Sequence, residues 1–182
     1  DSISFEGYQL SLVEDFSTLA AFDCGDADLN EFFCLDGKNY HNELLAKIYS
    51  LAPIHDSKEI IALISYHNDS IKLKEEQKQD LPDEKRRYKE YPAVKIGRLA
   101  VKKQLQGNQI GTLLISLTIR FFLTKNRTGC RYLTVDAYNN EKVLRFYSKN
   151  GFDFLTHKDV NKHTRTMYLD LKHFEDDIVY LK

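Results

Sequence analysis

A short polar stretch that contains Gly107 and Gly111 leads into a strongly apolar segment. Apolar residues recur there at helical spacing, at Ile110, Leu113, Leu114, Leu117 and Phe121, which predicts a buried helix. The first N–H groups of a helix have no partner within it, and with the helix dipole they attract an anion such as pyrophosphate. Glycine lets a ligand approach the backbone closely. The stretch predicts a phosphate site, although such turns also form for steric reasons alone.

Two motifs resemble the GNAT superfamily of N-acetyltransferases. Leu99-Ala100-Val101 is followed by Gln106 to Gly111, where the family has Arg/Gln-x-x-Gly-x-Gly/Ala. Farther on, Asn140 precedes the Tyr147 of a Phe-Tyr-x-x-x-Gly-Phe motif that ends at Phe152. The resemblance spans about residues 8–171. It implies one acetyltransferase domain over residues 1–182, of class α/β (α+β), with a mixed, bent sheet that has helices on both faces and strand 96–101 splayed from strand 131–137.

The resemblance also implies an enzyme that uses acetyl-coenzyme A, whose thioester the acceptor amine attacks directly. The backbone of Leu99 and Val101 would pair with the pantetheine arm, and Asn140 would bond to the same arm. An N–H near Leu99 would polarise the thioester carbonyl, and the N–H groups from Gln106 to Thr112 would hold the pyrophosphate. The implied cofactor contacts are Leu99, Ala100, Val101, Gln106, Gly107, Asn108, Gln109, Ile110, Gly111, Thr112, Asn140 and Tyr147.

Within this resemblance Tyr147 is the candidate general acid. A phenol with a pKa near 10 stays protonated at neutral pH and can donate its proton to the leaving thiolate. The alternative is that Tyr147 only packs its helix. The base that deprotonates the acceptor stays open between Asp136, Glu31, Tyr66, Glu90 and a water relay.

One position departs from the family motif, because Gln109 stands where its first glycine belongs. If the turn keeps its shape, position 109 must tolerate a side chain, and we expect Gln109 to point to solvent. A second expectation concerns Arg98, which lies between apolar neighbours on the cofactor strand. If buried, it must be paired, either within the protein or with a substrate or partner.

A narrower resemblance involves the N-terminal half. The stretch from Phe22 to Phe32 (FDCGDADLNEF), with Asp80-Leu81-Pro82, Lys85-Arg86-Arg87 and Tyr91 to Val101, is similar to a GNAT subgroup that includes toxins of toxin–antitoxin modules. These toxins acetylate the amino acid carried on a transfer RNA. The resemblance therefore adds tRNA and an antitoxin-like protein as candidate partners, and leaves a homodimer open.

Three functions compete at this point. The first is N-acetylation of a small-molecule, peptide or protein amine, and the second is toxin-type acetylation of aminoacyl-tRNA. The basic and aromatic run Lys85-Arg86-Arg87-Tyr88-Lys89 favours the second, because phosphates and bases need such side chains. The net charge of −1 offers RNA no long-range attraction. The third is a non-catalytic module that binds acetyl-coenzyme A, against which the retained Tyr147 argues.

The elements that position these residues follow from hydrophobic periodicity and turn signals. We expect strands at 8–13, 46–51, 59–67, 93–101, 131–137, 152–155 and 166–171. We expect a broken helix over 26–46, the buried helix from 110, and a helix over 141–149 that Asn150-Gly151 ends. Residues 70–91 are nearly all charged and form an insertion that is either solvated or substrate-facing.

Composition limits the class of protein. Hydrophobic residues make up 42% and charged residues 29% of 182 residues, which is typical of one soluble globular domain. Cys24, Cys34 and Cys130 are widely spaced and predict reduced thiols, and His157 and His163 predict surface residues rather than metal ligands. No apolar run is long enough to span a membrane, and no secretory signal is evident. We therefore expect a cytoplasmic enzyme without a metal.

Overall fold

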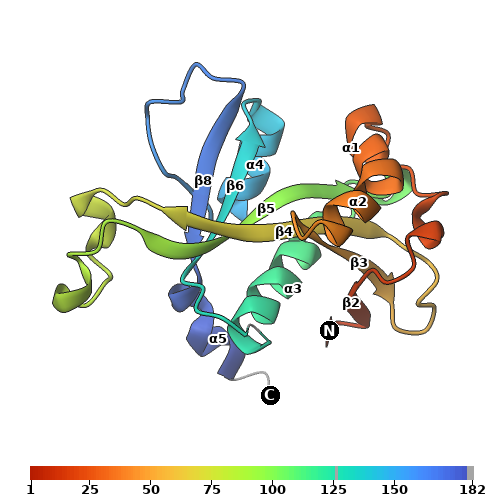
Figure 1. Cartoon of the computed structure of the whole chain (residues 1–182), viewed down its shortest axis with the longest axis horizontal. Coiled ribbons are helices and arrows are strands. Elements are labelled where there is room, and N and C mark those ends of the chain that lie inside the picture. Colours follow the sequence, from red (N-terminus) through yellow and green to blue (C-terminus); the bar gives the residue numbers. More distant parts are fainter. Residues whose placement is uncertain (126, 180–182) are drawn as a thin grey trace. The chain divides into compact units, whose positions relative to one another are not determined.

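In residues 1–125 and 127–179, which the computed structural model describes, eight strands form one sheet in the order β1-β2-β3-β4-β5-β6-β8-β7 (Figure 1). Helices lie between the strands along the chain. The predicted α/β class, a mixed sheet flanked by helices, is confirmed.

The chain divides into two compact units. The first comprises Asp1–His67 and Ile96–Asn126, and the second comprises Asn68–Lys95 and Arg127–Lys182. Strands β4 (Ala62–Ile71) and β5 (Tyr91–Val101) each begin in one unit and end in the other. The single domain expected for residues 1–182 and the splay between 96–101 and 131–137 stay predictions.

The strands at the start of the first unit are antiparallel. They are β1 (Ser2–Phe5), β2 (Tyr8–Leu12) and β3 (Lys47–Pro53). Glu6 and Gly7 join β1 to β2 with positive φ angles of 49° and 82°, the backbone of a tight hairpin turn. The strand expected at 8–13 is confirmed. The sequence prediction did not include β1, because its two apolar residues are too few to define a pattern.

Helices cover both faces of the first unit's strands. On one side lie α1 (Ala27–Glu31), a π-helical turn (Phe32–Asp36) and α2 (Gly37–Asn42), and α3 (Ile110–Thr124) lies on the other (Figure 1). The expected broken helix is therefore confirmed as three short pieces. In the part of the chain that the structure describes, no helix is long and apolar enough to cross a membrane.

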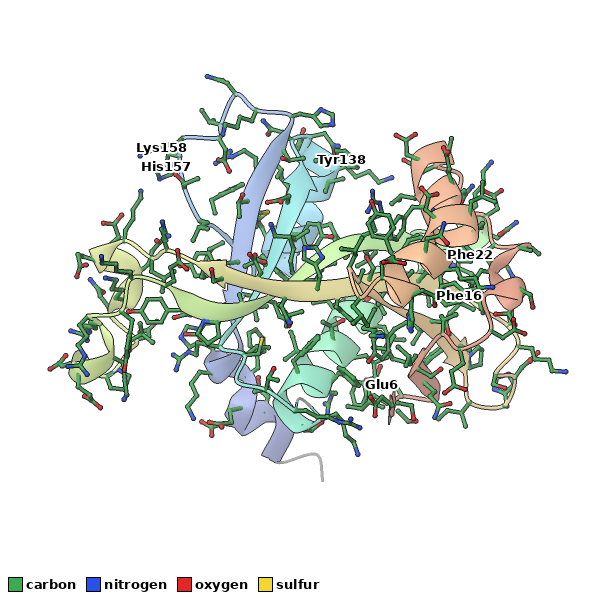
Figure 2. All side chains as sticks on the ribbon, viewed as in Figure 1. Glu6, Phe16, Phe22, Tyr138, His157 and Lys158 are labelled. Atoms are coloured by element: carbon green, nitrogen blue, oxygen red, sulfur yellow. The ribbon has the colours of Figure 1, made fainter. Side chains whose placement is uncertain are left out.

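Each face of the first unit has its own core. On the α1–α2 side the buried side chains are Val13, Leu19, Phe22, Cys24, Phe32, Phe33, Ile48, Leu63 and Ala100. Figure 2 shows Phe22 beside α1 and Phe16 close to it. On the α3 side, the rings of Tyr49 and Phe121 meet edge to face with centroids 5.1 Å apart. The first core includes Ala100 at the end of β5, and the second contact packs the later part of α3 against β3.

The second unit pairs β6 (Tyr132–Tyr138), β8 (Thr164–Asp170) and β7 (Asp153–Phe154) in antiparallel fashion. Helix α4 (Glu141–Lys149) has the predicted bounds, and α5 (Glu175–Val179) follows β8. Gly151 ends the α4 segment with φ +89°. A Cβ at this glycine would lie 3.1 Å from the Phe174 ring, so both the backbone conformation and the packing require glycine.

Residues 72–90, which connect β4 to β5, form a charged lobe. The flanking strands extend to Ile71 and from Tyr91, so the lobe is slightly shorter than the expected insertion. Leu73 and Leu81 are buried in a cluster with Tyr91, Ala93 and Tyr132, which joins the lobe to the core of the sheet. This cluster makes the lobe an ordered substructure rather than a bare solvated loop.

Candidate active site

The end of β5 turns into α3 through residues 102–109, called the β5–α3 turn below. A short 3-10 helix (Lys103–Leu105) is followed by two left-handed residues, Gly107 with φ +86° and Gln109 with φ +61°. Gln109 thus has a backbone conformation that glycine adopts without strain, and the residue is exposed as expected. Position 109 therefore tolerates a side chain, although glutamine rarely adopts a left-handed backbone.

Many backbone donors in this region have no protein partner. The N–H groups of Gln106 and Asn108 point at the carbonyls of Lys103 and Leu105, at 3.4 and 3.3 Å. Among the described residues, no hydrogen bond engages the N–H groups of Gly107, Gln109, Ile110, Gly111 and Thr112. Free donors at the start of a 15-residue helix form a site for an anion, so the residues fit a pyrophosphate.

The strand that precedes the turn contributes one fully buried side chain to the core. Ala100 is buried in the core on the α1–α2 side, whereas Leu99 and Val101 are half-buried. The Val101 carbonyl accepts a hydrogen bond from the Gln106 side chain at 3.0 Å, and the Lys102 N–H donates to Ile61. Ala100 thus serves the core with its side chain, so its contact with a cofactor would come from its backbone.

Asn140 and Tyr147 belong to the second unit, at the start and in the middle of α4. The Asn140 Oδ1 caps the helix by accepting the Val143 N–H at 3.0 Å. Its amide nitrogen donates no hydrogen bond to the part of the chain that the structure describes. Asn140 is exposed, so this nitrogen is free for a ligand.

The Tyr147 ring is buried between Phe146 and Phe152, with ring centroids at 5.0 and 5.3 Å. Burial raises the pKa of its phenol above the ordinary value, so the hydroxyl is protonated at neutral pH. No described residue bonds to this hydroxyl. The Tyr147 hydroxyl is therefore a protonated donor without an acceptor among the described residues.

Most of the candidate base side chains already bond to other groups of the protein. The Tyr66 hydroxyl is buried, bonds to Thr118 Oγ1 at 2.6 Å and has a raised pKa because of burial, all of which argue against Tyr66 as the base. Asp136 accepts hydrogen bonds from Lys95 and Thr166. Glu90 accepts from Ser70 and is 3.5 Å from the Lys72 ammonium. Glu31 is exposed at the end of α1. A dedicated base is therefore not evident in this set.

Two polar residues differ from the sequence expectations. Arg98 is exposed rather than buried, and its guanidinium lies 3.9 Å from the centre of the Phe32 ring, a cation–π contact that needs no carboxylate. Arg86, in the lobe, donates from Nε to the carbonyls of Lys78 and Leu81 and from Nη2 to that of Gln79, at 2.8–3.1 Å. Arg86 is thus a structural residue of the lobe. No sequence signal distinguishes it from the basic residues beside it.

The described residues give little support to a nucleophilic cysteine or to a metal site. Burial raises the pKa of all three cysteines, that of Cys130 to about 11, so few thiolates exist at neutral pH. In residues 1–125 and 127–179, no group of three or more His, Cys, Asp and Glu side chains is placed to hold a metal ion. His157 and His163 are exposed as expected, and Figure 2 shows His157 and Lys158 on the segment between β7 and β8.

The sequence model of the acetyltransferase (GNAT) family matches residues 26–152. The chain belongs to the GNAT acetyltransferase family. This membership confirms the expected GNAT fold, the N-acetyltransferase class of enzyme and acetyl-coenzyme A as the acetyl donor. The match contains the β5–α3 turn and α4, which carry the candidate site residues.

Solved structures with a similar fold extend over nearly the whole acetyltransferase. A structure of AtaT complexed with acetyl-methionyl-tRNAfMet is 22% identical, covers 94% of this chain and 99% of that chain, and has a TM-score of 0.76. A KacT point mutant is 23% identical with the same coverages and a TM-score of 0.76. AtaTR bound with acetyl-coenzyme A is 22% identical, covers 96% of this chain and 99% of that chain, and has a TM-score of 0.71. These likenesses show the fold.

Proposed function

We propose that this acetyltransferase transfers the acetyl group of acetyl-coenzyme A to the α-amino group of an amino acid esterified to tRNA. The observation that carries the RNA part is a strip of unpaired cations in the lobe. Lys85, Arg87 and Lys89 are exposed and form no ion pair with any described residue. Tyr88 lies among them with 45% of its surface exposed, and the Arg87 guanidinium lies over its ring, 5.7 Å from the ring centre.

The lobe's acidic residues are largely neutralised within the lobe or by its neighbours. Four carboxylates have a lysine or arginine within 4 Å, namely Glu75, Glu76, Asp83 and Glu90. Asp80 lies 3.1 Å from His173 Nε2 instead. Glu84 is the acidic side chain of residues 72–90 for which the described residues provide no partner. The near-neutral composition of the lobe therefore conceals an uncompensated basic strip, which is the feature that phosphate binding requires.

The donor half of the reaction rests on the β5–α3 turn. The unpaired N–H groups of Gly107 and Gln109 to Thr112 would bind the pyrophosphate, and the backbone of Leu99 and Val101 would hold the pantetheine arm. An N–H near Leu99 would polarise the thioester carbonyl, and the Asn140 amide nitrogen would bond to the arm. Acetyl-coenzyme A supplies the activated acetyl group.

Proton transfer on the acceptor side favours an α-amine. An α-amino group has a pKa of about 7.7–8.0, against about 10.4 for a lysine side chain, so a useful fraction is already neutral at physiological pH. An enzyme without a dedicated base can therefore use an α-amine far more readily than a lysine. On the donor side, the Tyr147 hydroxyl would donate its proton to the leaving thiolate, which disfavours a non-catalytic module.

The comparisons support the same acceptor and add a protein partner. The similar AtaT was solved with acetyl-methionyl-tRNAfMet, and a point mutant of the AtaT toxin was solved bound to the C-terminus of the antitoxin AtaR. We extend the proposal to an antitoxin-like protein that holds this enzyme inactive. A homodimer stays a prediction.

The test is acetyl transfer from labelled acetyl-coenzyme A to total charged tRNA, with deacylated tRNA and free amino acids as parallel acceptors. We expect label in the charged tRNA fraction, at a rate that falls steeply with salt. Lys85→Glu with Arg87→Glu should abolish this transfer and flatten the salt dependence, while Arg86 is left intact because it holds the lobe together. Lys38→Glu with Lys58→Glu makes the same change in net charge on exposed residues elsewhere and should leave transfer unchanged.

Label in free amines but not in charged tRNA would overturn the RNA acceptor in favour of a small-molecule or peptide amine. Unchanged tRNA acetylation and salt dependence in the Lys85→Glu, Arg87→Glu variant would leave tRNA as the acceptor but remove the lobe as its binding surface.

A further inference from the structure

We infer that the segment Asp23–Asn30 is a brace that holds the β5–α3 turn in its phosphate-binding form, and that Gln106 and Asn30 are positioning residues for acetyl-coenzyme A. The inference rests on the proposed role of that turn. It assigns a task to the N-terminal FDCGDADLN stretch, which the catalytic residues leave unexplained.

Two hydrogen bonds fasten the turn to the brace. The Lys103 N–H donates to the Asp23 carbonyl at 2.9 Å, and the Gln106 Nε2 donates to the Cys24 carbonyl at 2.7 Å. The same Nε2 donates to the Val101 carbonyl at 3.0 Å. One side-chain amide thus ties the end of β5, the turn and the brace together, and it does so directly before the unpaired N–H groups begin.

The side chain of Asn30, on α1, holds the brace in shape. Asn30 Oδ1 accepts the Cys24 N–H at 2.9 Å and lies 3.1 Å from the Cys24 Sγ. Its Nδ2 donates to Asp23 Oδ1 at 2.8 Å, and Asp23 Oδ1 also accepts the Gly25 N–H at 2.7 Å. The Asn30 side chain therefore fixes the direction of the carbonyls that the turn uses.

Packing anchors the brace at both ends. Cys24 is 5% exposed and belongs to the buried cluster that also contains Ala100 on β5. Gly25 has φ +79°, and a Cβ there would lie 3.2 Å from Lys103 Cδ. The aliphatic part of the Lys103 side chain therefore packs directly against Gly25. Asp26 accepts the Leu29 N–H at 3.0 Å and caps α1. The brace is thus continuous with the core and with a helix.

The turn has few bonds of its own, which is why a brace matters. Its internal bonds are short-range contacts such as Leu105 N–H to Lys102 O, and both Gly107 and Gln109 are left-handed. A segment of this kind binds a ligand tightly only when its donors are held ready, because ordering them on binding lowers the affinity. Loss of the brace should therefore appear as weaker acetyl-coenzyme A binding.

The first test replaces Gln106, whose side chain is mostly at the surface. Gln106→Met keeps the length and removes both donated bonds, so KM and Kd for acetyl-coenzyme A should rise at least about fivefold, the usual consequence of lost hydrogen bonds. The kcat, the KM for the acceptor and the Tm should change little. Gln106→Arg, which the family motif also allows, restores N–H donors and should restore the affinity.

The second test is a swap of two polar partners. Asn30→Asp keeps an acceptor for Cys24 but sets two carboxylates against each other at Asp23, and should weaken acetyl-coenzyme A binding. Adding Asp23→Asn restores a donor–acceptor pair with the original net charge and should recover most of the loss, which a double-mutant cycle measures. Asp36→Asn, on an exposed residue outside the brace, is the matched control and should bind like the unmodified enzyme.

Gly111→Glu separates this inference from the function on which it rests. If Gly111→Glu abolishes acetyl-coenzyme A binding but Gln106→Met and Asn30→Asp bind normally, the turn is the phosphate site and the brace is overturned. If Gly111→Glu also binds normally, the assignment of the turn itself fails. A lower Tm with unchanged affinity in Asn30→Asp would make Asn30 purely structural and would equally overturn the brace.

Discussion

The Lys95 ammonium donates a hydrogen bond to an Asp136 carboxylate oxygen at 3.0 Å. Thr166 Oγ1 donates to the other Asp136 oxygen at 2.9 Å. Both carboxylate oxygens already accept a hydrogen bond, so a substrate ammonium would have to compete with Lys95 and Thr166 for them. Asp136 is therefore better explained as part of a polar network on the sheet than as the catalytic base.

We predict that Asp136→Asn lowers kcat by less than about threefold, since general-base catalysis is usually worth at least about 10²-fold. The measurement is steady-state acetylation of the true acceptor at saturating acetyl-coenzyme A. A loss of two orders of magnitude with intact folding would instead establish Asp136 as the base.

The phenol of Tyr147 gives the second prediction. Tyr147→Phe keeps the ring between Phe146 and Phe152 but removes the donor, so kcat should fall by roughly 10²-fold or more. Affinity for acetyl-coenzyme A, measured by calorimetry, should be nearly unchanged, because the donated proton matters only as the thiolate leaves.

Tyr66→Phe is the matched control for this substitution. It removes an equally buried phenol, but one that bonds to Thr118 at 2.6 Å in the first unit. We expect a loss of about 1 kcal/mol in the free energy of unfolding and an unchanged kcat. Wild-type turnover by Tyr147→Phe would reduce that tyrosine to a packing residue.

The raised pKa of Tyr147 makes a prediction about pH. Burial disfavours the phenolate, so the pKa lies above the ordinary value of 10 and the acid form persists through the neutral and mildly alkaline range. The rate should rise with pH as the acceptor amine loses its proton, with a midpoint near about 8 for an α-amine. No descending limb should appear below about pH 10. A descending limb between pH 7 and 9 in the kcat profile would show that another group is the acid.

Local patterns predicted the elements that carry the site. The bounds of α4 follow from the Asn140 cap and the Gly151 stop, and both are formed as expected. The periodic apolar residues placed the start of α3 correctly. These features depend on residues within a few positions of each other, which is why one sequence was enough to place them.

Contacts between residues far apart in the sequence could not be predicted from such local patterns. Arg86 looks like its basic neighbours in the sequence, and only the folded lobe shows that it holds three carbonyls. Arg98 was expected to be paired if buried, yet it stacks on Phe32, 66 positions away. The bond from Gln106 to Cys24 joins residues 82 positions apart. Such partners are set by packing and leave no periodic signal.

Gly111→Glu tests the β5–α3 turn directly. The new carboxylate would lie in the first turn of α3, beside N–H groups that are proposed to bind a pyrophosphate. Repulsion between the two anions should weaken acetyl-coenzyme A binding at least about tenfold, or about 1.4 kcal/mol. Calorimetry on the folded variant is the measurement, and an unchanged Kd would remove the turn from the cofactor site.

The left-handed backbone at Gln109 supports a last prediction, which uses three residues at one position. Gln109→Gly relieves strain of roughly 1 kcal/mol, but glycine also makes the unfolded chain freer by roughly 0.5–1 kcal/mol. The net change in unfolding free energy should therefore stay within about 1 kcal/mol, with acetyl-coenzyme A binding retained. Gln109→Val has no such compensation, because a β-branched side chain is a genuine outlier at positive φ. It should lower both stability and affinity, since the turn must change shape and carry its free N–H groups with it. Denaturant unfolding and calorimetry on the two variants check the order, and equal behaviour of glycine and valine would show that the left-handed turn does not determine cofactor binding.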